Sequence, residues 1–260
     1  MQKRKNQMNT KKTDWEPVSL WYMKYLQEDT DSYHAKVIIP NLLRLLGNVK
    51  GKRILDLGCG NGVVGHILAE QGSFIFGVDG SKTLIDSAKT GAKTNEKYFT
   101  QDVRTGLPKE CKDIDACISI LSIQNMDSLH TVFESVAKSL TKNGTLHIVT
   151  LHPSFRIPQL SDWTFDEKRN EQGRTVFTYM SESKISIAQN PSKKDSPQSI
   201  TFHRPLQVYS KTLQNAGFGI RRLEEWCSHK ESLSGKRKAA EDKARKEIPM
   251  FLYIEAVRVQ

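Results

Sequence analysis

The stretch LDLGCGNG carries the clearest chemical signal in the chain, because three glycines stand at alternate positions beside a carboxylate. Asp56 precedes Gly58 by two residues, and Gly60 and Gly62 follow. At the turn after a first strand, missing side chains let backbone amides approach a nucleotide. The Asp56 carboxylate would repel a pyrophosphate but attract a ligand with an ammonium and a sulfonium group. We therefore expect a positively charged adenosyl ligand, with an ordinary Rossmann turn as the alternative.

Two further acids follow apolar runs in the same way. Asp79 ends the run in GVDGS, and Asp102 follows the run in TQDV. The carboxylate of Asp79 can accept hydrogen bonds from both ribose hydroxyls of an adenosine. Asp102 can accept from the adenine amine while the backbone N–H of Val103 faces the ring. A single acid at a strand end is more often a cap, but three at successive strand ends favour a shared ligand.

An alternation of apolar runs and helical patterns must position these residues. Strands are expected over 52–58, 73–80, 97–103, 115–123, 145–151, 219–226 and 249–259, with helices over 35–47, 62–72, 81–92, 128–140 and 206–218. This alternation predicts an α/β fold with a parallel sheet wound on both faces. Ser81 is a candidate N-cap, Gly217 closes a helix, and the Lys142, Asn143 and Gly144 run predicts a turn.

Four segments stand apart from the alternation. Residues 1–14 are basic and polar and predict a disordered tail, and residues 15–47 carry two amphipathic helical patterns. Residues 152–205 are too long for an ordinary connection and predict an insertion on the substrate side. Residues 230–246 mix both signs of charge and predict a solvated surface helix. We expect residues 15–260 to form a single domain.

Together, the motifs LDLGCGNG, GVDGS, TQDV, ISILSIQNM and LTKNGTLHIV resemble the class I S-adenosylmethionine-dependent methyltransferases, especially the small-molecule group related to quinone-biosynthesis enzymes. The resemblance is strong over residues 43–151. It implies a Rossmann-like, doubly wound, seven-stranded sheet, mostly parallel with an antiparallel last strand, and an N-terminal helical lid. It also implies S-adenosylmethionine as cofactor and S-adenosylhomocysteine as product. The cofactor residues that it implies are Asp56, Gly58, Cys59, Gly60, Asn61, Gly62, Asp79, Gly80, Ser81, Asp102, Val103, Ile120, Leu121 and Ser122.

Two histidines are candidates for a catalytic role. Transfer from a sulfonium is an in-line displacement, which a general base assists when the acceptor must lose a proton. His152 directly follows the fifth predicted strand, at the edge where the pocket is expected, and is the first candidate base. A histidine that caps the strand is an equally good interpretation. His203 lies where the insertion rejoins the fold and is the second candidate.

Substrate contacts are expected from the lid and the end of the insertion. Tyr22, Tyr33 and His34 lie in the N-terminal segment, where they could cover the cofactor and exclude water. Phe202 and Arg204 flank His203 and could contact the acceptor. For the lid aromatics, packing on the sheet's helices is the alternative.

Charge leaves the class of acceptor open. The formal net charge of +10 in 260 residues would suit a nucleic acid, but much of it lies in the tail and the mixed-sign segment. The LSIQNM run also replaces the N/D-P-P-Y-type loop with which amino-directed nucleic-acid enzymes hold a flipped base. A small-molecule acceptor is therefore favoured over RNA or the ribosome. A non-catalytic cofactor-binding protein is a third interpretation.

Cysteine spacing and hydropathy limit the remaining possibilities. Four cysteines form no CxxC pair and no ligand set with histidine, so we expect neither a metal nor a disulfide framework. The longest apolar run, 116–123, is too short for a membrane span. A cytoplasmic protein is expected, and its oligomeric state is left open.

Overall fold

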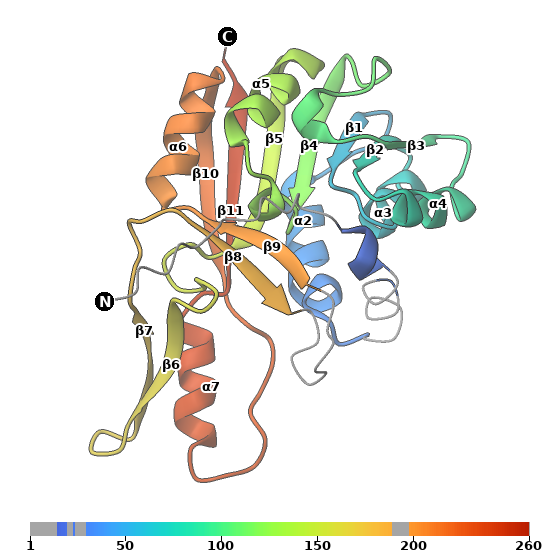
Figure 1. Ribbon diagram of the computed structural model, residues 1–260. Coiled ribbons are helices and arrows are strands. Elements are labelled where there is room, and N and C mark those ends of the chain that lie inside the picture. Colours follow the sequence, from blue (N-terminus) through green and yellow to red (C-terminus); the bar gives the residue numbers. More distant parts are fainter. Residues whose placement is uncertain (1–14, 20–22, 24–29, 189–197, 260) are drawn as a thin grey trace.

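A seven-stranded sheet forms the centre of the protein, in the order β10-β11-β5-β4-β1-β2-β3 (Figure 1). The computed structural model describes residues 15–19, 23, 30–188 and 198–259. The strands of this sheet are β1 Arg53–Leu57, β2 Phe74–Asp79, β3 Glu96–Thr100, β4 Ile114–Ile120, β5 Leu140–Leu151, β10 Phe218–Trp226 and β11 Phe251–Arg258.

Strand directions confirm the predicted topology. The pairs β1–β2, β2–β3, β1–β4 and β4–β5 are parallel, whereas β11 is antiparallel to both β5 and β10. Parallel strands end at one edge of a sheet, so the residues that follow β1, β2, β3 and β4 meet there. Because β11 runs the other way, it begins at that same edge.

Helices cover both faces of the sheet, as expected for a doubly wound fold. One apolar core joins α2 (Ile39–Leu46), α3 (Val63–Glu70) and α4 (Lys82–Thr90) to one face. The other core joins α5 (Leu129–Ser139) and α6 (Leu206–Asn215) to the opposite face. Double coverage explains why β4 is buried at six of its seven positions rather than at alternate ones.

Short helices and caps connect these elements. The π-helix η2 (His34–Ile38) leads into α2, and three 3₁₀ turns are η1 (Glu16–Val18), η3 (Val103–Thr105) and η4 (Ile123–Asn125). Ser81 is confirmed as the N-cap of α4, because its hydroxyl accepts a hydrogen bond from Leu84 N at 3.2 Å. The predicted tail and the first helical pattern, including Tyr22, lie mostly outside the described residues.

The predicted insertion contains two hairpins. One pairs β6 (Ser161–Asp166) with β7 (Glu171–Val176), and the other pairs β8 (Ser183–Ala188) with β9 (Gln198–His203). Figure 1 shows the β6–β7 hairpin beside α7 (Lys238–Glu247), both extending away from the sheet. No described helix is both long and apolar enough to cross a bilayer.

Two local predictions need correction. The turn expected at 142–144 lies inside β5 as an irregularity, where the register with β4 shifts and Asn143 adopts a φ of 64°. The charged segment 230–246 is helical only from Lys238, and its helix packs against β7 rather than lying free in solvent. Burial of Ala240 and Ala244 gives α7 a small-residue face that the charge pattern conceals.

Candidate active site

A cavity of about 730 Å³ opens where the parallel strands end. Its volume is within the range of about 300–1,000 Å³ that small-molecule and cofactor sites have. Of the residues predicted from sequence to bind cofactor or substrate, the cavity wall contains Tyr33, His34, Gly58, Gly60, Asp79, Gly80, Ser81, Asp102, Val103, Ile120, Leu121 and Ser122.

Gly58 is a glycine because the end of β4 leaves no room for a side chain. It has a φ of +72°, and a Cβ there would lie 2.4 Å from Cβ of Ser122. Ser122 in turn donates its hydroxyl hydrogen to Leu57 O at 2.7 Å and lies 2.7 Å from Ser119 Oγ. The Ser122–Leu57 hydrogen bond thus joins the end of β4 to the end of β1 beside the cavity wall.

Asp79 connects the glycine loop to the start of α4. Its two carboxylate oxygens accept hydrogen bonds from Gly60 N at 3.0 Å and from Ser81 N at 2.9 Å. Burial raises the pKa of Asp79, and the backbone N–H groups oppose that rise by stabilising the ionised form. A carboxylate held this way gives the cavity wall a fixed negative group.

Asp56 lies close to Asp79 but not in the cavity wall. It is 3% exposed, and no side-chain hydrogen bond joins it to another described residue. Burial, together with the charge of Asp79, raises the pKa of Asp56 to about 7. Two neighbouring buried acids favour the binding of a cation, because a positive charge offsets both effects. This is the ligand charge expected from LDLGCGNG.

Asp102 caps η3 and also pairs with an arginine. Its carboxylate accepts from Arg104 N at 3.0 Å and binds the Arg104 guanidinium at 2.8 and 2.5 Å. Arg104 makes a second ion pair with Asp127 at 2.9 Å. Among the described wall residues, Arg104 is the single lysine or arginine, and two carboxylates neutralise it.

His152 and His203 lie outside the cavity wall, and nearby groups bind their rings. Nε2 of His152 contacts Glu225 Oε1 at 2.6 Å, while Nδ1 accepts from Ser154 N at 3.2 Å. His203 Nε2 donates to the Tyr179 carbonyl at 2.7 Å. Neither histidine lines the cavity and both rings already have hydrogen-bond partners, so the geometry favours neither as a base. Each one fixes the end of a strand instead.

His34 is the histidine that lines the cavity. It begins η2, and no described residue makes a hydrogen bond or ion pair with its ring. Burial lowers the pKa of His34 to about 4, so the imidazole is neutral at pH 7. Beside it, the Tyr33 hydroxyl lies 3.1 Å from Ser228 Oγ, and the Tyr33 ring packs edge-on against Phe251.

Several other predicted residues are placed outside the wall. Phe202 is flanked by Lys184 and Arg204, whose charged groups lie 5.9 and 4.9 Å from the ring centroid. Arg204 is 4% exposed and donates to the carbonyls of Met126 and Asp127. It therefore supports the loop after β4 instead of reaching an acceptor. Besides Asp56, three predicted cofactor residues of LDLGCGNG lie outside the wall: Cys59, Asn61 and Gly62.

About half of the wall residues were not among those predicted from the sequence. These residues are Trp15, Leu84, Arg104, Gln124, Asn125, Met126, Leu151, Ile187, Ser199, Thr201, Met250 and Phe251. Residues 124–126 follow the end of β4, so the strand-end reasoning that selected Asp79 and Asp102 could have found them. Met250 and Phe251 could have been found from the antiparallel last strand. The three residues of the β8–β9 hairpin carry no signal in the sequence.

The strand order and the acid-lined cavity are those of the S-adenosylmethionine-dependent methyltransferases. A family model described as a methyltransferase domain matches residues 48–178, half of the chain. The protein belongs to this family, is a methyltransferase, and uses S-adenosylmethionine.

Similar proteins support this assignment. A solved S-adenosylmethionine-dependent methyltransferase from Mesorhizobium loti is 27% identical, with a TM-score of 0.68 over 84% of this chain and 96% of that one. A second structure, from Listeria monocytogenes, is 25% identical, with a TM-score of 0.67 over 85% and 97%. The ubiquinone biosynthesis O-methyltransferase of Coxiella burnetii is 31% identical over 42% of this chain. The match spans about half the length of that relative, 47%.

Proposed function

We propose that the protein methylates a small, largely uncharged acceptor held between the cofactor and the β8–β9 hairpin. The observation that carries the proposal is the chemistry of the cavity wall on that side. Ile187, Ser199 and Thr201 from the hairpin, with Met250 and Phe251 from the start of β11, contribute apolar and hydroxyl groups and no cation. A nucleic-acid acceptor would call for lysine or arginine beside its phosphates.

The opposite side of the wall is suited to the cofactor. Asp79 would accept hydrogen bonds from the ribose hydroxyls, and Asp102 with Val103 would contact the adenine. Gly58 and Gly60 would leave room for the methionine part, and Asp56 would stabilise its positive charge from behind the wall. The buried acids support this assignment, because burial raises the pKa of both Asp56 and Asp79.

His34 is proposed as the general base in place of His152 and His203. S-adenosylmethionine supplies an electrophilic methyl group whose bond to sulfur breaks as the bond to the acceptor forms. An oxygen or nitrogen nucleophile must also lose a proton, and the neutral His34 ring could accept it. The name of the Coxiella relative, an O-methyltransferase, supports an oxygen nucleophile. With a pKa of about 4, His34 is a weak base, so it would accept the proton as the methyl bond forms and the acceptor oxygen or nitrogen becomes positively charged and strongly acidic.

A screen with the labelled methyl donor tests the proposal. Purified protein would be incubated with methyl-labelled S-adenosylmethionine and fractionated cell extract, with and without nuclease treatment. We expect label in a small organic-soluble product that survives nuclease. Label that remains with nucleic acid and disappears after nuclease would overturn the proposal.

A further inference from the structure

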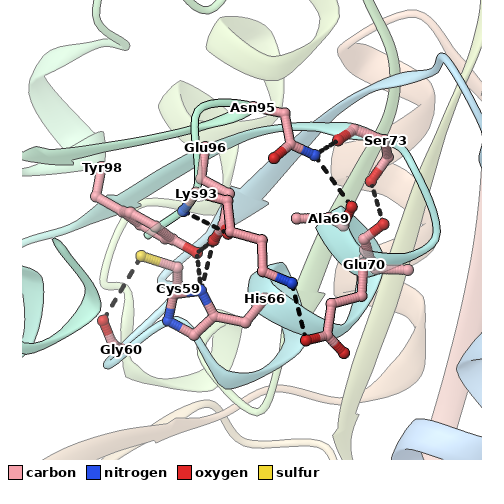
Figure 2. A network of polar contacts seen from close by, with 11 residues as sticks. Cys59, Gly60, His66, Ala69, Glu70, Ser73, Lys93, Asn95, Glu96 and Tyr98 are labelled. Atoms are coloured by element: carbon pink, nitrogen blue, oxygen red, sulfur yellow. Dashed lines mark hydrogen bonds and ion pairs between the residues drawn. The ribbon is translucent and has the colours of Figure 1, made fainter. Parts of the chain in front are cut away.

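A buried tyrosine supports the glycine loop from the side that faces away from the cavity. Tyr98 belongs to β3, is 5% exposed, and pairs in register with Gly77 of β2. Its ring lies beneath the loop and its hydroxyl reaches the start of α3, as Figure 2 shows from close by. Tyr98 does not line the cavity.

Three glycines leave the space that this ring fills. A Cβ at Gly77 would lie 2.3 Å from Cδ1 of Tyr98, and one at Gly62 would lie 2.9 Å from the hydroxyl oxygen. At Gly65, in the first turn of α3, a Cβ would lie 2.7 Å from the same oxygen. Real Cβ atoms do not approach other atoms so closely. These glycines therefore accommodate Tyr98, whereas Gly58 and Gly60 border the cavity.

Polar contacts fix the position of the tyrosine hydroxyl. It donates to Glu96 Oε2 at 2.7 Å, and the same carboxylate contacts Nδ1 of His66 at 2.5 Å and accepts from Lys93 N at 3.0 Å (Figure 2). Burial acts to raise the pKa of Glu96, but these hydrogen bonds outweigh it and lower that pKa. Because His66 belongs to α3 and Glu96 to β3, the network joins the helix after the loop to the strand beneath it.

We propose that Tyr98 is a positioning residue for the cofactor, setting the distance between the glycine loop and the sheet. Gly62 is the N-cap of α3 and has a φ of 80°, so its contact with Tyr98 lies where the loop leads into the helix. Gly60, two residues earlier, donates to Asp79 in the cavity wall. A shift of α3 against Tyr98 therefore moves the amide that holds Asp79. The inference concerns cofactor binding and does not depend on the identity of the acceptor.

A size-exchange experiment tests the proposal. Gly65→Ala should raise the Kd for S-adenosylhomocysteine about fivefold or more, because the new methyl group collides with the Tyr98 hydroxyl. Alanine favours a helix interior, so the backbone itself gives no reason for weaker binding. Tyr98→Phe alone should raise the Kd about two- to tenfold through the lost hydrogen bond.

The double variant supplies the decisive comparison. Without the hydroxyl, the nearest atom to a Cβ at Gly65 is Cγ2 of Ile75 at 3.1 Å, and the ring carbon is 3.6 Å away. In the Tyr98→Phe background, Gly65→Ala should therefore change the Kd by less than about twofold. The matched control is Gly219→Ala in β10, where the nearest atom is 3.5 Å from the new methyl group, and its Kd should equal that of the wild type.

Affinity is measured by calorimetry well below the lowest Tm, so that a loss of stability alone leaves the Kd unchanged. Equal effects of Gly65→Ala in both backgrounds, or variants that lower Tm without changing the Kd, would overturn the proposal. If Gly65→Ala folds in neither background, Tyr98→Phe alone decides, and an unchanged Kd rejects the positioning role.

Discussion

The two sides of the cavity are built from different parts of the chain. On the side proposed to hold the cofactor, Gly58, Asp79, Asp102 and Ser122 each lie within two residues of the end of a parallel strand. On the acceptor side, the wall combines the N-terminal segment, the β8–β9 hairpin and the start of β11, which lie far apart in sequence. Residues at the ends of parallel strands therefore form the proposed cofactor side, whereas packing between segments distant in sequence forms the proposed acceptor side.

Histidines show the same difference. His152 follows a strand end and looked catalytic, but its ring is held by Glu225 and by Ser154 N. His34, which precedes the first strand by about twenty residues, lines the cavity instead. Position relative to a strand end therefore predicted the cavity residues proposed to hold the cofactor better than the histidine proposed as base.

The largest expected effect is on the cofactor side. Asp79→Ala should weaken S-adenosylmethionine binding by about 2–4 kcal/mol, because it removes the proposed ribose contacts and the two amide contacts that hold the loop. Calorimetry measures the change. Asp86→Ala, which removes an exposed partner of Lys82 on the same helix, is the matched control. Equal affinities for Asp79→Ala and wild type would contradict the assignment.

On the acceptor side, His34→Ala should lower turnover about 100-fold while leaving the Kd for S-adenosylmethionine nearly unchanged. Single-turnover transfer of labelled methyl to the identified acceptor measures the rate. Since the pKa of His34 is about 4, the wild-type rate at saturating S-adenosylmethionine should fall with acid only as the pH approaches that value. An unaltered rate in His34→Ala would show that His34 is not the base.

A bulky residue in the β8–β9 hairpin should affect binding of the acceptor but not of the cofactor. Ile187→Trp should raise the KM for the acceptor about tenfold, because the added ring occupies space in the wall, while cofactor affinity stays the same. Ser186→Trp is the matched control, since Ser186 is exposed and lies outside the wall. Weaker cofactor binding with an unchanged KM for the acceptor would show that the hairpin lies on the cofactor side instead.

Cofactor binding should depend on pH near neutrality. The pKa of Asp56 is raised to about 7 in the free protein, and a bound cation lowers it by favouring the carboxylate. Affinity for S-adenosylmethionine should therefore weaken as the pH falls below about 7, by a few-fold per pH unit. Calorimetry in buffers of different ionisation enthalpy should detect proton release at pH 7. In Asp56→Asn both the release and the pH dependence should decrease.

The smallest functional effect is expected for His152. His152→Ala should lower the free energy of unfolding by about 1–2 kcal/mol through lost hydrogen bonds. Turnover should change by less than about threefold, since the ring lies outside the wall. Denaturant unfolding and the labelled-methyl assay measure the two quantities. A hundredfold loss of turnover with normal stability would restore His152 as the base.

The apolar runs, each bounded by glycine or an acid, predicted the strands of a doubly wound parallel sheet, and the resemblance to the methyltransferase family implied the antiparallel last strand. Strand-end position placed Gly58, Asp79 and Asp102 at the cavity, since parallel strands bring their ends to one edge, and the family resemblance added Ile120, Leu121 and Ser122. Sequence reasoning assigned all three glycines of LDLGCGNG to the ligand, however, whereas Gly62 makes room for Tyr98. Nothing in the spacing reveals a tyrosine 36 residues further along the chain.

What the sequence determined by itself is the order of strands and helices and the set of acids at the strand ends. Periodicity and strand-end position are local properties, so they can be recognised without the fold. Tertiary structure alone decided which histidine and which hairpin line the cavity, and which glycines leave room for Tyr98 instead of bordering the cavity. Those choices depend on contacts between residues distant in sequence, whose geometry exists only once the sheet and its insertion have packed together.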